Sequence, residues 1–234
     1  RLYNIHLMND IPLRLGEVRR RIRAAAEAAG READEVALLA VSKTKPASDI
    51  VAAYHEGQRQ FGENYLQDAL PKIQVLADLA IEWHFIGRLQ SNKAAEISRH
   101  FAWVHGIDQH RHAVRLSDHR PVQAPPLQVC IQVNLSGEAT KGGIQPAELP
   151  ALAHVVAGLP RLRLRGLMTL PSPTTDLATQ HAVFAQLRGL LEDLQQRGLE
   201  LDTLSMGMSA DMEAAIAEGS TMVRIGTDIF GPRG

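Results

Sequence analysis

The sequence predicts a (β/α)8 barrel with one additional helix at its N-terminus. Short apolar runs rich in β-branched residues alternate with segments whose apolar residues recur every three or four positions, and this alternation is typical of parallel strands joined by helices. About eight such units fit into 234 residues, which is the lower size range of this barrel. The alternative is a doubly wound open sheet, but that fold normally places a glycine-rich turn after its first strand, and VSKTKP at 41–46 contains no glycine.

The elements follow in order along the chain. A leading helix over residues 12–30 precedes the repeat. Strands are expected to start near residues 36, 59, 81, 102, 127, 164, 203 and 222, and helical spacing is clearest over residues 50–56, 65–79, 149–157, 178–196 and 210–218. We therefore expect residues 12–234 to form one domain, preceded by an extension over residues 1–11 that can be partly vector-derived.

The charge balance and composition exclude several classes of protein. Lys and Arg number 25 against 26 Asp and Glu, so no basic excess favours a nucleic-acid partner or a membrane surface. No apolar run approaches the roughly 18 residues of a membrane span, and the first residues lack the apolar stretch of a signal peptide. The single cysteine, Cys130, is expected to be a buried strand residue in a reducing compartment, so we expect a cytoplasmic protein.

Lys43 is the first candidate for chemistry. It follows the apolar run 36–41 and shares its period-2 parity with Leu39 and Val41, so an inward-facing strand would place its ammonium at the mouth of the barrel. Desolvation among apolar neighbours lowers the pKa of a lysine and frees its amine for Schiff-base chemistry. A lysine at a strand end that reaches solvent is the alternative interpretation.

Two glycine-containing turns near the C-terminus indicate an anion site. Gly207 and Gly226 permit a close approach of a phosphate at the ends of strands seven and eight, and Ser209 is expected to be the N-cap of the helix that follows. Asp211 and Glu213 would repel an anion unless they face away. Ordinary caps and turns are the alternative interpretation.

Arg224 lies in the middle of an apolar strand, where a guanidinium requires a partner. Either an acidic neighbour or a ligand heteroatom would satisfy it. A mouth lysine, an anion turn and a buried arginine together favour pyridoxal 5'-phosphate (PLP), which has an aldehyde, a phosphate and a ring nitrogen. The histidines near His110 and His112 are expected in a loop without converging carboxylates, so we expect no metal site.

The chain closely resembles the pyridoxal phosphate homeostasis proteins of the YggS/PROSC type, which are similar in fold to the N-terminal barrel of alanine racemase. The resemblance runs from about residue 12 to the end of the sequence. It is carried by AVSKTKP at 40–46, QFGENY at 60–65, EWHFIG at 82–87, LQSNK at 89–93, RGLM at 165–168, SMGMS at 205–209, DME at 211–213, RIGT at 224–227 and IFG at 229–231.

The resemblance implies a role for each matching residue. Lys43 resembles the lysine that forms the Schiff base with PLP, and Arg224 resembles the partner of the pyridine nitrogen. The remaining cofactor-binding positions are Ser209, Gly226 and Thr227 for the phosphate, Gly207 and Met208 for the shape of its cradle, and Asn64, His84 and Met168 along the cofactor. Lys141 resembles a second lysine that is implicated in cofactor transfer or regulation.

The expected function is PLP binding in vitamin B6 homeostasis, with little or no catalysis. An always cationic arginine disfavours a protonated ring nitrogen and makes PLP a weaker electron sink. The sequence ends at Gly234, which leaves no room for the second domain that supplies another acid–base group in alanine racemases. A small amino-acid racemase with Lys43 as its base, and a Schiff-base aldolase or isomerase for a sugar phosphate, are the alternatives. Expected partners are PLP and the apo forms of PLP enzymes, with the chain itself a monomer.

Overall fold

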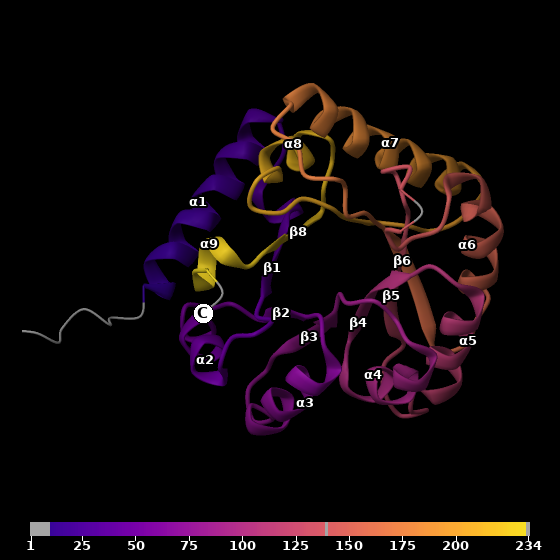
Figure 1. The fold of residues 1–234 in the computed structure, drawn as a ribbon, viewed down its shortest axis with the longest axis horizontal. Helices are drawn as coiled ribbons and strands as arrows, with labels where there is room; N and C mark the ends of the chain where they lie inside the picture. The colour runs from indigo at the N-terminus through magenta and orange to yellow at the C-terminus, as the bar shows by residue number, and fades with distance from the viewer. Residues whose placement is uncertain (1–9, 139, 233–234) are drawn as a thin grey trace, which may run out of the picture.

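Eight parallel strands close into a barrel in the order β1-β2-β3-β4-β5-β6-β7-β8, so the predicted (β/α)8 fold is confirmed (Figure 1). The computed structural model describes residues 10–138 and 140–232. The strands are β1 (Ala37–Val41), β2 (Gln60–Glu63), β3 (Glu82–Phe85), β4 (Trp103–Ile107), β5 (Leu127–Gln132), β6 (Leu162–Met168), β7 (Thr203–Ser205) and β8 (Met222–Ile225).

Helices surround the barrel and connect its strands (Figure 1). The α-helices are α1 (Ile11–Ala28), α2 (Ala47–His55), α3 (Leu66–Val75), α4 (Ala94–His100), α5 (His110–His119), α6 (Leu149–Ala157), α7 (Leu177–Gln196), α8 (Met212–Ala217) and α9 (Thr227–Phe230). Short 3-10 turns are η1 (Ala33–Glu35), η2 (Ser91–Lys93) and η3 (Pro146–Glu148). The prediction of a loop at His110–His112 is wrong, because these residues form the first turn of α5.

The apolar residues form two kinds of core. The larger core lies between the outward-facing strand residues and the helices, and it includes Phe61, Val104 and Phe184. The barrel interior holds much smaller clusters, one around Leu39 and Val41 and another around Trp103, Cys130 and Met168. The rest of the interior is therefore available to polar side chains.

Helix α1 covers the barrel beside the last two strand–helix units (Figure 1). Its buried residues recur every three or four positions and form one apolar stripe, Ile11, Leu15, Val18, Ile22 and Ala26, which faces α8 and α9. The extension expected over residues 1–11 lies mostly outside the described residues, and α1 begins at its last residue, Ile11. Across the described ranges, no helix is both long and apolar enough to cross a membrane.

The stripe on α1 generates a prediction about stability. Leu15 is fully buried, so Leu15→Ala is expected to lower the free energy of unfolding by about 2–5 kcal/mol through lost burial and a residual cavity. Leu13 is on the same helix but 77% exposed, so Leu13→Ala is the matched control and should change stability by less than about 0.5 kcal/mol. Equal losses in urea denaturation would contradict this packing.

Candidate functional site

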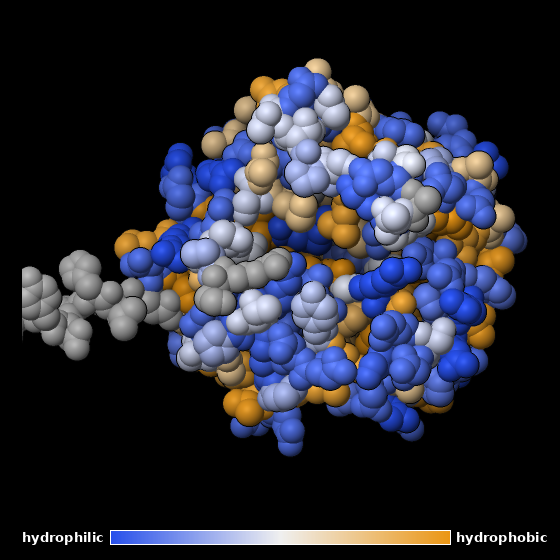
Figure 2. All heavy atoms as spheres, viewed as in Figure 1, coloured by the Kyte–Doolittle hydropathy of each residue, from blue (hydrophilic) through white to orange (hydrophobic). Residues whose placement is uncertain are grey.

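A cavity of about 310 Å³ lies at the carboxyl ends of the strands, where barrels of this class carry their sites. In Figure 2 the face that carries α9 is hollowed near its centre. We call this hollow the mouth cavity. Its described lining is Val41, Lys43, Thr44, Lys45, Asn64, Ile86, Leu170, Met208, Ser209, Ala210, Arg224, Gly226, Thr227 and Gly231.

Lys43 enters the mouth cavity from the turn that follows β1. Leu39 and Val41, which share its parity, lie in the barrel interior, so the expected orientation of this strand face agrees with the structure. The backbone N–H of Lys45 donates to the carbonyl of Ser42 at 3.1 Å and closes a tight turn around Lys43. Thr44 adopts a φ of 63°, a conformation that costs a non-glycine residue about 1–3 kcal/mol. Such strain is typical of functional turns.

A buried ion pair supports this turn from below. The Glu63 carboxylate accepts hydrogen bonds from Ser42 Oγ at 2.7 Å and from Lys72 Nζ at 2.8 Å. Lys72 Nζ also donates to the Ser42 carbonyl at 3.0 Å, directly before Lys43. Burial raises the pKa of Glu63, and the bonds from Lys72 and Ser42 oppose that rise. The position of Lys43 therefore depends on a charge pair that itself does not line the cavity.

Asn64 lies across the cavity at the end of β2. A Cβ atom at Gly87 would collide with the carbonyl of Asn64, so only glycine lets the chain after β3 pass this closely. The Asn64 Oδ1 atom is buried and lacks a hydrogen-bond partner among the described residues. A buried acceptor without a partner costs free energy unless a ligand or water supplies a donor.

The turn after β7 differs from the sequence prediction. Helix α8 begins at Met212, and its N-cap is Asp211 instead of the expected Ser209. The Asp211 carboxylate accepts from the backbone N–H of Met208 at 2.7 Å, which folds residues 208–211 into a turn before the helix. Gly207 has a φ of 100°, and a Cβ atom there would lie 2.7 Å from Ala215 Cβ. Glycine is thus required at this position.

Arg21 of α1 links this turn to the one after β8. Its guanidinium donates to the Ser209 carbonyl at 3.1 Å, to Glu213 at 2.9 Å and to Asp228 at 2.7 Å. Glu213 is thereby drawn towards α1, which meets the condition that it face away from an anion. The role of Arg21 cannot be predicted from local sequence patterns, because its partners are about 190 to 210 residues distant in the chain.

The turn after β8 brings two backbone segments together. A Cβ atom at Gly226 would lie 3.1 Å from the Val41 carbonyl, so glycine permits β8 to approach β1 beside Lys43. Gly226 is the N-cap of α9, and Thr227 is the first residue of that helix. Gly226, Thr227 and Ser209 all line the mouth cavity.

Arg224 is the deepest cation of the mouth cavity and is only 4% exposed. Its Nη1 donates to Ser205 Oγ at 2.8 Å, and its Nη2 donates to the Thr169 carbonyl at 2.9 Å. Burial lowers the pKa of Arg224 to about 10, opposed by the charge of Asp211, so the side chain is still a cation at neutral pH. None of the ion pairs found in the described residues involves Arg224, so its direct partners are neutral.

Four other predicted site residues lie outside the cavity lining. His84 and Met168 are buried inside the barrel, and Gly207 lies behind the turn that carries Met208 and Ser209. Lys141 belongs to the loop after β5, where its Nζ donates to Ser172 Oγ at 2.5 Å and pairs with Glu138 at 3.3 Å.

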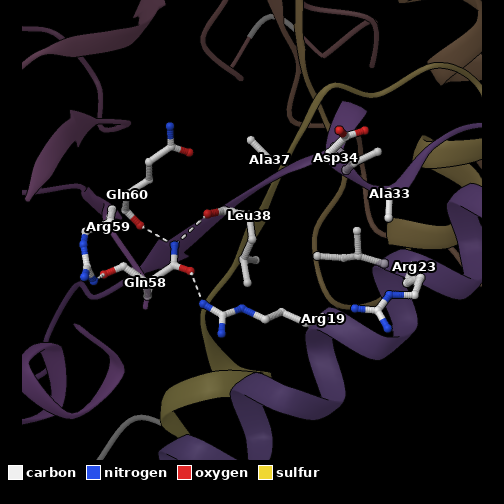
Figure 3. Close-up of a pocket in the computed structure, with 11 residues that line it drawn as sticks. Arg19, Arg23, Ala33, Asp34, Ala37, Leu38, Gln58, Arg59 and Gln60 are labelled. Atoms are coloured by element: carbon white, nitrogen blue, oxygen red, sulfur yellow. Dashed lines mark hydrogen bonds between the residues drawn. The ribbon is translucent and has the colours of Figure 1, made fainter. Parts of the chain in front are cut away.

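A larger cavity of about 460 Å³ lies at the opposite end of β1 and β2, beside α1 and η1 (Figure 3). Arg19 points across it to Gln58, whose amide donates to the carbonyls of Leu38 and Gln60. These polar groups are satisfied by one another, and the amino ends of barrel strands usually serve stability. In the ranges that the structure describes, no cluster of three His, Cys, Asp or Glu residues suits a metal ion.

The fold of the chain matches a known class of proteins. Residues 13–234 match the family model described as the alanine racemase N-terminal domain. An alanine racemase of Clostridium difficile superposes on this chain with a TM-score of 0.71 at 15% sequence identity. The match covers 95% of this chain and 56% of the racemase, and at this identity it shows a shared fold alone.

Relatives of higher identity narrow the class. A pyridoxal phosphate homeostasis protein of Pseudomonas aeruginosa is 59% identical over 226 residues, 97% of each chain. Its counterpart in Escherichia coli strain K12 is 56% identical over 229 residues, 97% of this chain and 98% of its own. PipY of Synechococcus elongatus, solved with PLP bound, is 40% identical with a TM-score of 0.83, over 94% of this chain and all of its own. The chain therefore belongs to the family of pyridoxal phosphate homeostasis proteins.

The pair beneath Lys43 generates a prediction about stability. Lys72→Met would leave the Glu63 carboxylate buried without its cation, and we expect the free energy of unfolding to fall by about 3–5 kcal/mol. The double variant Lys72→Met/Glu63→Gln removes the charge as well and should recover part of that loss. Arg99→Met, which breaks an exposed pair with Glu96, is the control and should cost less than about 1 kcal/mol. A Lys72→Met variant as stable as Arg99→Met would contradict the buried pair.

Proposed function

We propose that this protein binds PLP in the mouth cavity through Lys43, holds it without appreciable turnover and releases it to other proteins. The observation that carries the proposal is the placement of Lys43, Arg224 and the Ser209 and Gly226 turns around one cavity. The PLP-bound structure of PipY, which is 40% identical, supports the choice of ligand.

The residues of the cavity fit the chemistry of PLP. When bound, PLP supplies an aldehyde that condenses with a primary amine, a phosphate dianion and a pyridine ring with a phenolic hydroxyl. Lys43 would provide the amine, and the turns with Ser209, Gly226 and Thr227 would hold the phosphate. The unsatisfied Asn64 Oδ1 atom would accept a ligand hydrogen bond, and Arg224 would face the ring nitrogen. Met168 and His84 are buried beneath this lining, so they would not contact PLP directly but would support the residues that do.

Arg224 sets the electronic character that we propose for the site. A cation beside the ring nitrogen donates a hydrogen bond to it and disfavours its protonation. The ring then withdraws electrons more weakly than one that faces a carboxylate, which discourages loss of a proton from a bound amino acid, although a racemase can still operate with this arrangement. Arg224 is thus compatible with holding PLP, and the choice against a racemase rests on the other residues of the lining.

The titratable residues of the cavity support the same proposal over a racemase. In the lining that the structure describes, the titratable side chains are Lys43, Lys45 and Arg224. The ammonium of Lys45 donates to the Pro232 carbonyl at 2.7 Å. Racemisation requires acid–base groups on both faces of the substrate, and this lining contains no tyrosine, histidine or carboxylate for the second face.

The proposed cellular role is the storage and delivery of cofactor. Apo forms of PLP enzymes are the proposed recipients, and Lys141 is proposed to assist transfer because it lies outside the cavity on a loop beside Ser172. We further propose that the chain acts as a monomer in the cytoplasm, where its single cysteine stays reduced.

The lysine assignment is tested by trapping. PLP-loaded protein is reduced with borohydride, digested and mapped by mass spectrometry, and the label is expected on the peptide that contains Lys43. Lys43→Ala should lose the label and the visible absorption band of bound PLP, because the other lysine of the lining, Lys45, has its amine engaged by the Pro232 carbonyl. Lys93→Ala, which lies outside the cavity lining, should keep both. Label that persists in Lys43→Ala would assign the role to another lysine.

The absence of turnover is tested by proton exchange. PLP-loaded protein is incubated with alanine in deuterium oxide, and we expect exchange of the α-proton no faster than with free PLP. The physical reason is the weak electron sink beside Arg224 and the missing second acid–base group. Exchange or racemisation at an enzymatic rate would favour the racemase. A protein that stays colourless with PLP but cleaves a sugar phosphate would favour the aldolase.

A further inference from the structure

A row of polar side chains crosses the barrel interior and ends at Arg224. Glu82 and His84 lie on β3, His105 on β4 and Ser205 on β7. Glu82 is 42% exposed at the amino end of the barrel, whereas His84, His105 and Ser205 are fully buried. Successive members are joined by hydrogen bonds of 3.0 Å (Glu82–His84), 2.9 Å (His84–His105), 2.7 Å (His105–Ser205) and 2.8 Å (Ser205–Arg224).

At the Arg224 end of the row, the direction of the hydrogen bond between Arg224 and Ser205 is fixed. A guanidinium only donates, so Ser205 Oγ is the acceptor. The Ser205 hydroxyl then has one proton to donate, and His105 Nδ1 lies 2.7 Å away. Because a hydroxyl oxygen has two lone pairs, this end alone allows either direction between Ser205 and His105, and the other end of the row decides it.

The Glu82 end determines the direction of the whole row. The pKa of Glu82 is lowered, mainly by its hydrogen bond with His84, so the group is a carboxylate that only accepts. His84 must then carry its proton on Nε2. Gln60 Nε2 donates to the same carboxylate oxygen at 2.9 Å, and Trp103 stacks on the His84 ring at an interplanar angle of 6°, so both groups are held in place.

The two histidines complete the row in a single arrangement. Burial lowers the pKa of His84 and lowers that of His105 further, so both rings are neutral. With its proton on Nε2, His84 accepts at Nδ1 from His105 Nε2 at 2.9 Å. The unprotonated His105 Nδ1 then accepts from Ser205 Oγ at 2.7 Å. The opposite arrangement would set the lone pair of His84 Nε2 against the Glu82 carboxylate.

We propose that Glu82, His84, His105 and Ser205 form a one-directional hydrogen-bond relay that positions Arg224 for the ring nitrogen of the cofactor. The relay, together with the Thr169 carbonyl, fixes two guanidinium nitrogens and leaves the remaining N–H bonds for the mouth cavity. It also places the negative end of a row of dipoles towards a cation that lacks a carboxylate partner in the described structure. These four are positioning residues, and their role at the cofactor rests on the function proposed above.

The relay itself is tested without PLP. Two-bond ¹H–¹⁵N NMR of ¹⁵N-histidine-labelled protein distinguishes both neutral tautomers from the imidazolium, and His84→Gln and His105→Gln assign the two signals. We expect both rings to be neutral with the proton on Nε2 at neutral pH. A proton on Nδ1 of either ring, or an imidazolium at either position, would overturn the relay. Because this readout needs no ligand, it is independent of the proposed function.

The link to the cofactor is tested with matched serine variants. Ser205→Ala removes the acceptor for Arg224, and we expect the Kd for PLP to rise about tenfold and the absorption band of bound PLP to shift. Ser220→Ala is the control, because Ser220 is equally buried and its hydroxyl bonds only backbone carbonyls, among them Met206 at 2.6 Å. Its Kd and band should stay unchanged. Equal effects of both variants, or no effect of Ser205→Ala, would overturn the positioning role.

Discussion

The buried charge of Arg224 is the constraint on which the barrel interior depends. A guanidinium at 4% exposure loses most of its hydration, and no carboxylate in the described structure contacts it. Its compensation comes from neutral acceptors, Ser205 and the Thr169 carbonyl, and from the longer-range charge of Asp211. The barrel interior accordingly holds polar side chains beside its two small apolar clusters. A cation held in this way keeps donors directed at the mouth cavity.

The two sides of the mouth cavity are supported by different elements. Beneath Lys43, the buried pair of Glu63 and Lys72 holds the strained turn at Thr44. On the other side, Arg21 of α1 holds the turns after β7 and β8 together. A helix outside the eightfold repeat thus contributes to the site, because its packing on α8 and α9 places Arg21 beside both turns. Supporting contacts of this kind keep a binding geometry from loosening.

Most of the fold could be predicted from local sequence patterns, because apolar periodicity and strand ends depend on neighbouring residues. The eight strands begin within about two residues of their expected starts, and the parity of Lys43 with Leu39 and Val41 predicted its direction. The helix boundary was harder to predict: both Ser209 and Asp211 are good N-cap residue types, and residues 208–211 form a turn that delays the start of α8 to Met212. The relay was not predictable, because His105 and Ser205 are 100 residues apart in the chain and meet only when the barrel closes.

The central claim is that a cationic, prepositioned arginine faces the ring nitrogen of PLP in this barrel. The most direct measurement is the ¹⁵N chemical shift of PLP labelled at the pyridine nitrogen and bound to the protein, with Arg224→Gln for comparison. The account predicts an unprotonated, hydrogen-bonded nitrogen in the native protein and a changed shift in Arg224→Gln. A pyridinium shift in the native protein, or the same shift in both proteins, would contradict it.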